Sequence, residues 1–375
     1  MKFAALVFEG GPCSGKIESW VCRVREELCL DLMRRLGNLG IFDAVIAVTD
    51  RPDLARRAEV EAGAVASLGE AQTQFHFGRR LAELVQEFHV DAFVYISGGA
   101  GALMSTSELA SFAAISESVP DAIVANNIYS ADMFGCACAK RLIAYDIPGV
   151  DNQIPMWAAS KGMRPVGLEP TVGASFDIDT PADLMVLSGV IPSMRPELEH
   201  VAGEIASGPI FRAKDAFEGV RRCLATDLAE IALFGRVSPV TVNHLNSTTR
   251  CRIRAYSEER GMRAFGRDVP GGAKSLIAKL MEGIGFPRFF EGLAWCADAA
   301  LFDTRVFFSH MGADLSAEER FASDLFLWEQ VGHEGVAEFT RAAHDVGIPV
   351  VLGGHCLVSG GVRALAESGR VRDVV

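Results

Sequence analysis

Residues 3–16 have the sequence FAALVFEGGPCSGK. The first six are apolar throughout, which is typical of a strand buried on both faces. The glycines that follow predict a tight turn. A helix is expected over residues 19–36, where apolar side chains recur near helical spacing and Gly37 and Gly40 follow. A buried strand, a glycine turn and an amphipathic helix are the repeating parts of an α/β protein.

The same alternation continues through the first half of the chain. Each expected strand is a short apolar run, and segments with helical spacing separate these runs. Strands that are apolar on both faces belong to a mostly parallel sheet covered by helices on each side, so the sequence predicts a three-layer α/β/α domain. The expected strands are 44–49, 92–97 and 122–125, and the expected helices are 52–62, 78–89 and 105–114.

A second domain is expected because 375 residues exceed the size at which a single core usually stops growing. The segment Ile191-Pro-Ser-Met-Arg-Pro196 follows a helix and carries two prolines, so we expect the boundary there, with domains 1–191 and 196–375. The alternation then resumes, which predicts a C-terminal α/β domain. Its expected strands are 230–234, 252–256, 305–309 and 349–352, with helices at 239–246 and 334–346 and two within 273–300.

Composition and charge exclude several classes of protein. With 49% hydrophobic and 22% charged residues, the chain is neither disordered nor fibrous. Its formal net charge of -12 argues against a nucleic-acid partner, which requires clustered Lys and Arg. No apolar run approaches the roughly 18 residues that span a bilayer, and residues 3–8 are too few for a signal-peptide core. We therefore expect a cytoplasmic protein with no membrane partner, and homo-oligomerisation is left open.

The nine cysteines predict neither a metal centre nor a disulfide framework, because their number is odd and no C-x-x-C pair occurs. Most are expected to be small buried apolar residues. Cys136 and Cys138 are too close together for an ordinary chelate, and no second pair accompanies them.

The turn after the first strand carries a phosphate-binding pattern. Residues 10–16, GGPCSGK, satisfy G-x-x-x-x-G-K, in which backbone amides cradle phosphates and the lysine neutralises them. Ile17 stands where a magnesium-binding Ser or Thr belongs, so a different glycine-rich nucleotide loop and a plain tight turn both remain open. The candidate nucleotide-binding residues here are Gly10, Gly11, Ser14, Gly15 and Lys16.

A second motif ends the first half. In residues 176–187, FDIDTPADLMVL, we expect Asp177 and Asp179 to alternate on a short strand and point the same way. Thr180 and Pro181 suit the start of the next helix. Two carboxylates at the end of a sheet can hold Mg²⁺ with a nucleotide. The alternative is that Asp177 or Asp179 is only a second helix cap or a solvated turn residue.

Residues 177–184, DIDTPADL, resemble the D-[IV]-D-T-P-x-D-L ending of the molybdenum-cofactor nucleotidyltransferases and phospholactate guanylyltransferases. Residues 102–109, ALMSTSEL, resemble the start of a helix in the same proteins. The resemblance covers about the first 190 residues. It implies a glycosyltransferase-A-type fold, like that of nucleotide-diphospho-sugar transferases. It also implies an NTP substrate with Mg²⁺ and nucleotidyl transfer to a small phosphorylated acceptor.

This chain departs from the family pattern at two places. The family's first loop runs L-A-G-G-x-S-x-R-M-G-x-x-K, whereas residues 8–16 keep the glycines and the lysine but lose the Arg-Met-Gly core. The aspartate expected after the third strand is replaced by Ser97-Gly-Gly-Ala-Gly101. Asp132, which follows a later strand within the polar stretch 126–132, is a candidate substitute, and a surface turn explains that stretch at least as well.

The resemblance assigns roles to particular residues. Lys16 would contact the triphosphate and Asp179, with Asp177, the magnesium, while Gly10, Gly11, Gly98 and Gly99 would let the backbone approach base and phosphates. This assignment predicts that the glycine turn and Asp179 face each other. A catalytically silent nucleotide- or sugar-nucleotide-binding protein is the first alternative.

The second alternative is an enzyme whose active site lies in the C-terminal domain. Polar residues gather after its expected strands, where parallel strand ends converge on one edge of the sheet. His310 and His355 are candidate acid–base or metal-binding groups, and Glu258 is a candidate partner for either. A histidine after a strand is also often only a hydrogen-bonded core or loop residue.

Overall fold

The computed structural model describes residues 1–69 and 75–370. The chain divides into two compact units: residues 1–12 with 25–177, and residues 13–24 with the chain from 178 onward. We refer to these as the first and second units. The division after Asp177 comes earlier than the expected boundary at 191–196, because helix α8 (Pro181–Met194) packs against elements of the second unit.

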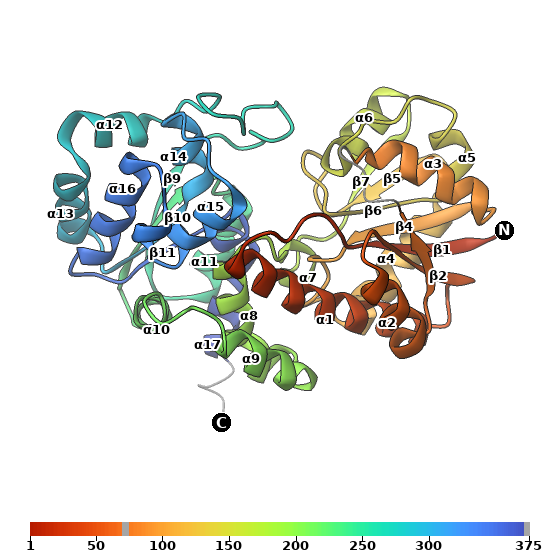
Figure 1. Cartoon of the computed structure of the whole chain (residues 1–375), viewed down its shortest axis with the longest axis horizontal. Coiled ribbons are helices and arrows are strands. Elements are labelled where there is room, and N and C mark those ends of the chain that lie inside the picture. The colour runs from red at the N-terminus through yellow and green to blue at the C-terminus, as the bar shows by residue number, and fades with distance from the viewer. Residues whose placement is uncertain (70–74, 371–375) are drawn as a thin grey trace. The chain divides into compact units, whose positions relative to one another are not determined.

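The first unit contains a mostly parallel seven-stranded sheet (Figure 1) with the strand order β3-β2-β1-β4-β6-β5-β7. Only β6 runs antiparallel to its neighbours, β4 and β5. The strands are β1 (Phe3–Phe8), β2 (Ala44–Thr49), β3 (Val65–Leu68), β4 (Ala92–Ser97), β5 (Ala122–Ala125), β6 (Met133–Cys136) and β7 (Arg164–Gly167).

Helices cover both faces of this sheet. Alternate residues of a strand point to opposite faces, so Phe3, Ala5 and Val7 pack against α1, α2 and α4, whereas Ala4 and Leu6 belong to the core with α3, α5 and α6. The three-layer α/β/α prediction is confirmed. The helices are α1 (Lys16–Asn38), α2 (Pro52–Ala62), α3 (Phe77–Glu87), α4 (Thr106–Ser118), α5 (Ala139–Leu142), α6 (Ile154–Ser160) and α7 (Val172–Ser175), with a 3-10 turn η1 (Asp151–Gln153).

The second unit contains a four-stranded parallel sheet with the order β11-β10-β8-β9. Three aromatic rings stack across neighbouring strands of one face: Phe234 lies 4.5 Å from Tyr256 and 4.2 Å from Phe302 between ring centroids. The predicted C-terminal α/β arrangement is therefore confirmed. The strands are β8 (Glu230–Gly235), β9 (Arg252–Ser257), β10 (Ala299–Asp303) and β11 (Val350–Gly353).

The helices of the second unit surround this sheet. Phe290, Phe307 and Phe339 from α13, α14 and α16 extend the aromatic core around Phe302, while α10 and α8 contact β11 and α17 packs on α8. The remaining bounds are α9 (Glu199–Ala206), α10 (Lys214–Leu224), α11 (Pro239–Thr248), α12 (Leu276–Ile284), α13 (Phe286–Cys296), α14 (Thr304–His310), α15 (Ala317–Asp324), α16 (Glu334–Asp345) and α17 (Gly360–Arg370), with 3-10 turns η2 (Pro196–Leu198), η3 (Trp328–Gln330) and η4 (Cys356–Val358).

Two expected strands are wrong. Residues 305–309 belong to helix α14, and the strand lies just before it, at Ala299–Asp303. Both segments are short and apolar, and periodicity alone cannot tell a buried strand from a buried helical turn. Residues 176–179 are not a strand either, so the alternation expected for Asp177 and Asp179 does not occur.

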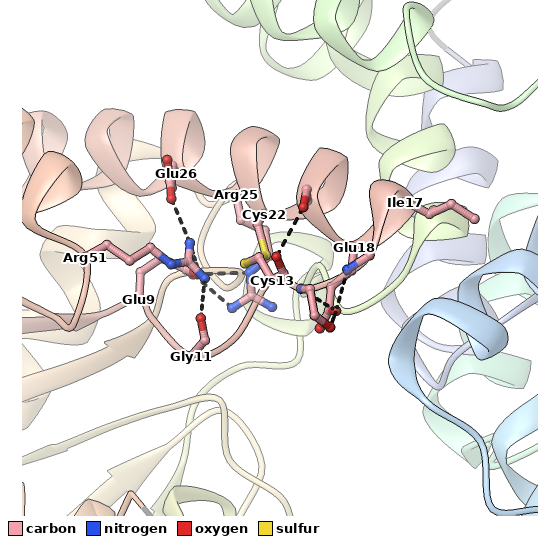
Figure 2. Close-up of a disulfide and its surroundings, with 12 residues drawn as sticks. Glu9, Gly11, Cys13, Ile17, Glu18, Cys22, Arg25, Glu26 and Arg51 are labelled. Atoms are coloured by element: carbon pink, nitrogen blue, oxygen red, sulfur yellow. Dashed lines mark hydrogen bonds and ion pairs between the residues drawn. A yellow bond between two sulfur atoms is a disulfide. The ribbon is translucent and has the colours of Figure 1, made fainter. Parts of the chain in front are cut away.

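The sequence predicted no disulfide framework, and it did not indicate the single disulfide that Cys13 and Cys22 form, drawn in Figure 2. It joins the glycine-rich loop to the second turn of α1, a pairing that neither the cysteine number nor their spacing indicates. The expectation of small buried residues holds for four of the seven free cysteines, Cys29, Cys136, Cys251 and Cys356. Among the described helices, none is long and apolar enough to cross a membrane.

Candidate functional site

The first sheet has a topological switch point at β1. The chain runs from β1 to β2 and β3 on one side and then returns to β4 on the other. Ligands of open α/β sheets bind outside the carboxyl ends of the strands at such a point. Residues 9–11 follow β1 and residues 98–99 follow β4. The two strand ends are in register, and the Gly98 amide donates to the carbonyl of Phe8 at 2.8 Å. The structure therefore brings the predicted glycines of both loops to one edge.

A buried carboxylate lies beneath this edge. Glu9 is only 4% exposed, and its Oε2 accepts from Arg25 Nε at 3.1 Å and Nη2 at 2.9 Å. Arg51 lies 3.7 Å from the other carboxylate oxygen (Figure 2). A Cβ at Gly98 would come within 2.2 Å of Glu9 Oε2. Only glycine lets the end of β4 approach this carboxylate so closely.

In the loop after β1, the backbone amide of Gly11 donates a hydrogen bond to a carboxylate. Gly11 N donates to Asp50 Oδ1 at 3.1 Å, and a Cβ at Gly10 would lie 2.6 Å from the same oxygen. Arg51 Nη2 donates to the carbonyl of Gly11 at 3.0 Å (Figure 2). A phosphate at this loop would therefore have to exchange with Asp50.

The start of α1, which belongs to the second unit, binds two more carboxylates. Ser14 N and Gly15 N donate to Glu18 at 3.0 and 3.4 Å. Ile17 N donates to both carboxylate oxygens of Glu318 at 3.0 Å, and a Cβ at Gly15 would lie 2.0 Å from Glu318 Oε2. The positive end of the helix dipole explains this attraction for anionic groups.

Lys16, the first residue of α1, is exposed. Over residues 1–69 and 75–370, no carboxylate pairs with it, so its ammonium group is accessible to a ligand. The disulfide Cys13–Cys22 and a hydrogen bond of 3.2 Å from Ser19 Oγ to the Cys13 carbonyl hold the preceding loop against the helix.

Asp132 lies at the carboxyl end of β4, where the sequence lacks the expected aspartate. Its carbonyl accepts from Ser97 N at 2.9 Å. Asn126 Oδ1 accepts from the Asp132 amide at 3.2 Å, and Asn152 Nδ2 donates to Asp132 Oδ1 at 3.2 Å. Asp132 thus occupies the place that the sequence suggested for a substitute.

Three carboxylates act on the hydroxyl of buried Tyr95. The hydroxyl donates to Asp151 Oδ2 at 2.5 Å. Burial raises the pKa of Tyr95 well above its usual value, and the negative charges of Asp151, Asp132 and Asp177 raise it further. Asp132 and Asp177 therefore lie within electrostatic range of one hydroxyl in the first unit.

This pair fits the way proteins hold Mg²⁺. In the described part of the chain, no group of three or more His, Cys, Asp or Glu residues is arranged to hold a metal ion. Magnesium in nucleotide enzymes usually takes only one or two carboxylates, and the substrate phosphates and water complete its shell. Asp132 and Asp177 match that requirement in number and chemistry.

The second sheet has its own switch point, between β8 and β10. Arg236 follows β8 and pairs with Asp303 at the end of β10: Nε lies 2.5 Å from Oδ2, and Nη2 lies 3.0 Å from Oδ1. The Asp303 side chain is fully buried. Burial raises the pKa of Asp303, but the Arg236 guanidinium outweighs it and the net shift is downward. Gly235, with φ of 102°, lets β8 close onto Asp303, whose Cβ would lie 2.7 Å from an added side chain.

His355 lies at the same edge, two residues after Gly353, which is the register partner of Asp303. Burial and, to a smaller extent, the positive charge of Arg236 lower the pKa of His355 to about 4, although the negative charges of Asp303 and Asp179 act in the opposite direction. The imidazole is therefore neutral at pH 7.

Asp179 belongs to this second group rather than to the first unit. A Cβ at Gly354 would lie 2.9 Å from Thr180 Cγ2, so the start of α8 packs on the loop after β11. As the sequence predicted, Thr180 is the N-cap and Pro181 opens the helix. Asp183, which was not singled out from the sequence, accepts from both Asp179 N and Thr180 N.

Glu258 and His310 meet at the start of α12. Glu258 accepts from Ser275 Oγ at 2.5 Å and from the Leu276 amide at 2.7 Å. His310 Nδ1 accepts from Ser275 N at 2.9 Å, and its Nε2 lies 3.4 Å from Glu282. Both residues hold the helix end, which favours the structural interpretation of them.

Arg236 follows an expected strand and is one of the polar residues that the sequence placed at this edge of the sheet. Asp303 was not predicted. The sequence predicted a strand at 305–309, whereas β10 ends at Asp303. Asp303 was therefore not expected to lie at the end of a strand.

No protein-family model matches the chain, and no curated protein matches it. Among solved structures, a protein of Desulfovibrio desulfuricans G20 described as a nucleotide-diphospho-sugar transferase is similar, with 13% identity, coverage of 58% of this chain and 97% of that chain, and a TM-score of 0.42. A cytidylyltransferase of Leptospira borgpetersenii has 13% identity over 55% of this chain and 98% of its own, with a TM-score of 0.41.

A CMP:2-keto-3-deoxy-manno-octonic acid synthetase in complex with CTP is also similar, with 11% identity, coverage of 49% of this chain and 96% of that chain, and a TM-score of 0.36. Similarity at this level specifies neither a reaction nor a substrate for this chain.

Proposed function

We propose that the first unit binds a nucleoside triphosphate with Mg²⁺ and transfers its nucleotidyl group to a small phosphorylated acceptor. The observation that supports this most is the switch point itself: the backbone of Gly98 closes on the end of β1, and Asp132 lies at the end of β4. The motif at 177–184 adds the sequence resemblance.

In this reaction an oxygen of the acceptor phosphate attacks the α-phosphorus of the triphosphate, and pyrophosphate leaves. The protein must position two anions and stabilise the charge that grows between them. The backbone at Gly10–Gly11 and Gly98–Gly99 would lie against the base and phosphates, because no side chain keeps the ligand away. Lys16, which the sequence motif assigns to the outer phosphates, belongs to the second unit, and its part in this site stays a prediction.

Asp132 and Asp177 would hold the metal, which when bound neutralises charge on the phosphates. We assign this role to Asp132 in preference to Asp179, since Asp132 and Asp177 share the surroundings of Tyr95 whereas Asp179 lies within range of Arg236 and His355. The NTP and the acceptor are to be found by experiment.

The test is pyrophosphate release from a panel of NTPs with phosphorylated acceptors. Asp132→Asn and Asp177→Asn should each lower the rate at least about tenfold, the loss expected for one charge-assisted contact to the reacting groups. Asp53→Asn, a change of an exposed carboxylate on α2, is the matched control and should leave the rate unchanged. Equal rates in all four proteins would refute the metal assignment.

Nucleotide binding without transfer is the second candidate. It is favoured by the bond between Gly11 N and Asp50 and by the lack of a carboxylate within residues 97–101. Saturable NTP binding with no pyrophosphate release from any acceptor would select it.

A further inference from the structure

We propose that the second unit has its own ligand site at the carboxyl ends of β8 and β10, where Arg236 and His355 bind the oxyanion group of a small molecule. This site does not depend on the nucleotidyl transfer proposed for the first unit. The groups that form it come from three neighbouring strand ends and lie wholly within the second unit.

The position is the one at which parallel sheets bind ligands. From β8 the chain runs to β9 on one side and then to β10 and β11 on the other, so the switch point lies between β8 and β10. Gly235 and Gly354 lack side chains where one would strike Asp303 and Thr180 respectively. These two glycines keep the backbone close to the strand ends.

Asp303 holds Arg236 in one orientation and leaves some of its N–H groups without an acceptor in the part of the chain that the structure describes. Its Nε and Nη2 donate to the two oxygens of Asp303, which uses two of the five N–H groups of the guanidinium. The other three donate to no acceptor in the described residues, and the side chain is 17% exposed. A guanidinium fixed in this way presents its remaining edge to a ligand oxygen.

His355 adds a second donor at the same edge. Its ring is half-buried and forms no hydrogen bond within the described parts of the chain. A neutral imidazole carries one N–H and one lone pair, so it can donate to one oxygen of a ligand and accept from a protonated one. A phosphate or carboxylate group satisfies both Arg236 and His355.

The surrounding charges limit what binds. Asp303 is compensated by Arg236, and Arg260 adds a positive charge within range of His355. Asp179 and Asp268 are negative charges that act on Arg236 and would repel an anionic ligand there. The oxyanion alone is therefore expected to bind weakly, and the rest of the ligand would supply the remaining affinity.

The experiment follows the ring signals of the eight histidines of the full-length protein by NMR at pH 7 and constant ionic strength. His355→Gln identifies the His355 signal. Titration with inorganic phosphate should shift that signal saturably. Sodium acetate is the second arm: a shift with phosphate alone points to a phosphoryl ligand, and a shift with both points to oxyanions in general.

Three variants test the role of Arg236. Arg236→Lys keeps the charge opposite Asp303 but loses the planar edge, and should weaken phosphate binding about tenfold. The double change Arg236→Met with Asp303→Leu leaves no unpaired buried charge and should abolish the shift. Arg288→Lys, a change of an exposed arginine on α13, is the control and should bind like the parent protein.

A fourth variant removes a charge that repels the ligand, and it should strengthen phosphate binding where the Arg236 variants weaken it. Asp179→Asn should strengthen phosphate binding, because one negative charge is removed from the same edge. Absence of a saturable His355 shift with either anion would overturn the proposal. So would phosphate binding that is equal in the parent and in the Arg236 variants.

Discussion

The carboxylate of Glu9 lies where a side chain at position 98 would have to be: Oε2 would be 2.2 Å, and the Glu9 Cβ 2.8 Å, from a Cβ built on Gly98. Glu9 cannot move away easily, because it is buried and bonded to Arg25. The turn after β4 is thus fitted to the end of β1, and this fit defines the edge at which we expect the nucleotide.

Gly98→Ala should therefore destabilise the protein by about 1–3 kcal/mol, the usual cost of overpacking. It should also weaken NTP binding, because the backbone at Gly98 must shift. Gly37→Ala in α1 is the control, since nothing lies within 4 Å of an added Cβ and alanine is the better helix former. Urea denaturation and NTP titration measure both effects. An unchanged Gly98→Ala variant would show that the fit is not required.

Glu318 should stabilise the start of α1. Its carboxylate accepts from the amides of Ile17 and Glu18, so Glu318→Gln removes a negative charge from the positive end of the helix. We expect a stability loss of about 0.3–1 kcal/mol in urea denaturation. The matched change Glu338→Gln, at an exposed site on α16, should leave the stability unchanged. Equal stability of Glu318→Gln and the parent protein would contradict this role.

The disulfide between Cys13 and Cys22 should stabilise the loop before α1. Closing a chain segment with a sequence separation of 9 is worth about 2–3 kcal/mol in the chain-entropy estimate. Urea denaturation with and without reductant should show a loss of this size in the parent protein. No such loss should occur in a Cys13→Ser, Cys22→Ser double variant. Mass spectrometry after alkylation checks the pairing directly, and labelling of both cysteines without reductant would refute it.

Asp183 should make stability depend on pH. Burial, and then the charge of Asp179, raises the pKa of Asp183 to about 7. A carboxyl group whose pKa is raised in the folded state stabilises that state below the unfolded pKa of about 3.9, and this contribution disappears as the pH rises through the folded pKa. From pH 4 to 7, the unfolding free energy of the parent should therefore fall relative to that of Asp183→Asn by a few kcal/mol. Parallel pH profiles of the two proteins would contradict this.

Much of the fold could be predicted because continuous apolar runs and helical spacing are local signals. Strands β1, β2, β4 and β5 and helix α2 lie where the sequence placed them. The end of β10 could not be placed, since two short apolar runs, residues 299–302 and 306–308, follow each other closely, and only the first is a strand.

The sites were predicted only in part, since they depend on contacts between distant residues. The glycines at 10–11 and 98–99 could be found from their turns, and Asp132 from its place after a strand. The bonds of Gly11 to Asp50 and of Ile17 to Glu318, and the pair of Arg236 with Asp303, join residues 39, 301 and 67 positions apart. Whether Gly10–Gly11 and Asp179 face each other, as the motifs predict, stays a prediction.

The most direct test of the proposed nucleotide site is a crystal structure of the protein with a non-hydrolysable NTP and Mg²⁺. We predict the nucleotide over Gly10–Gly11 and Gly98–Gly99, with the metal held by Asp132 and Asp177. A nucleotide bound instead against Arg236 and His355, with the edge of β1 and β4 empty, would contradict the account.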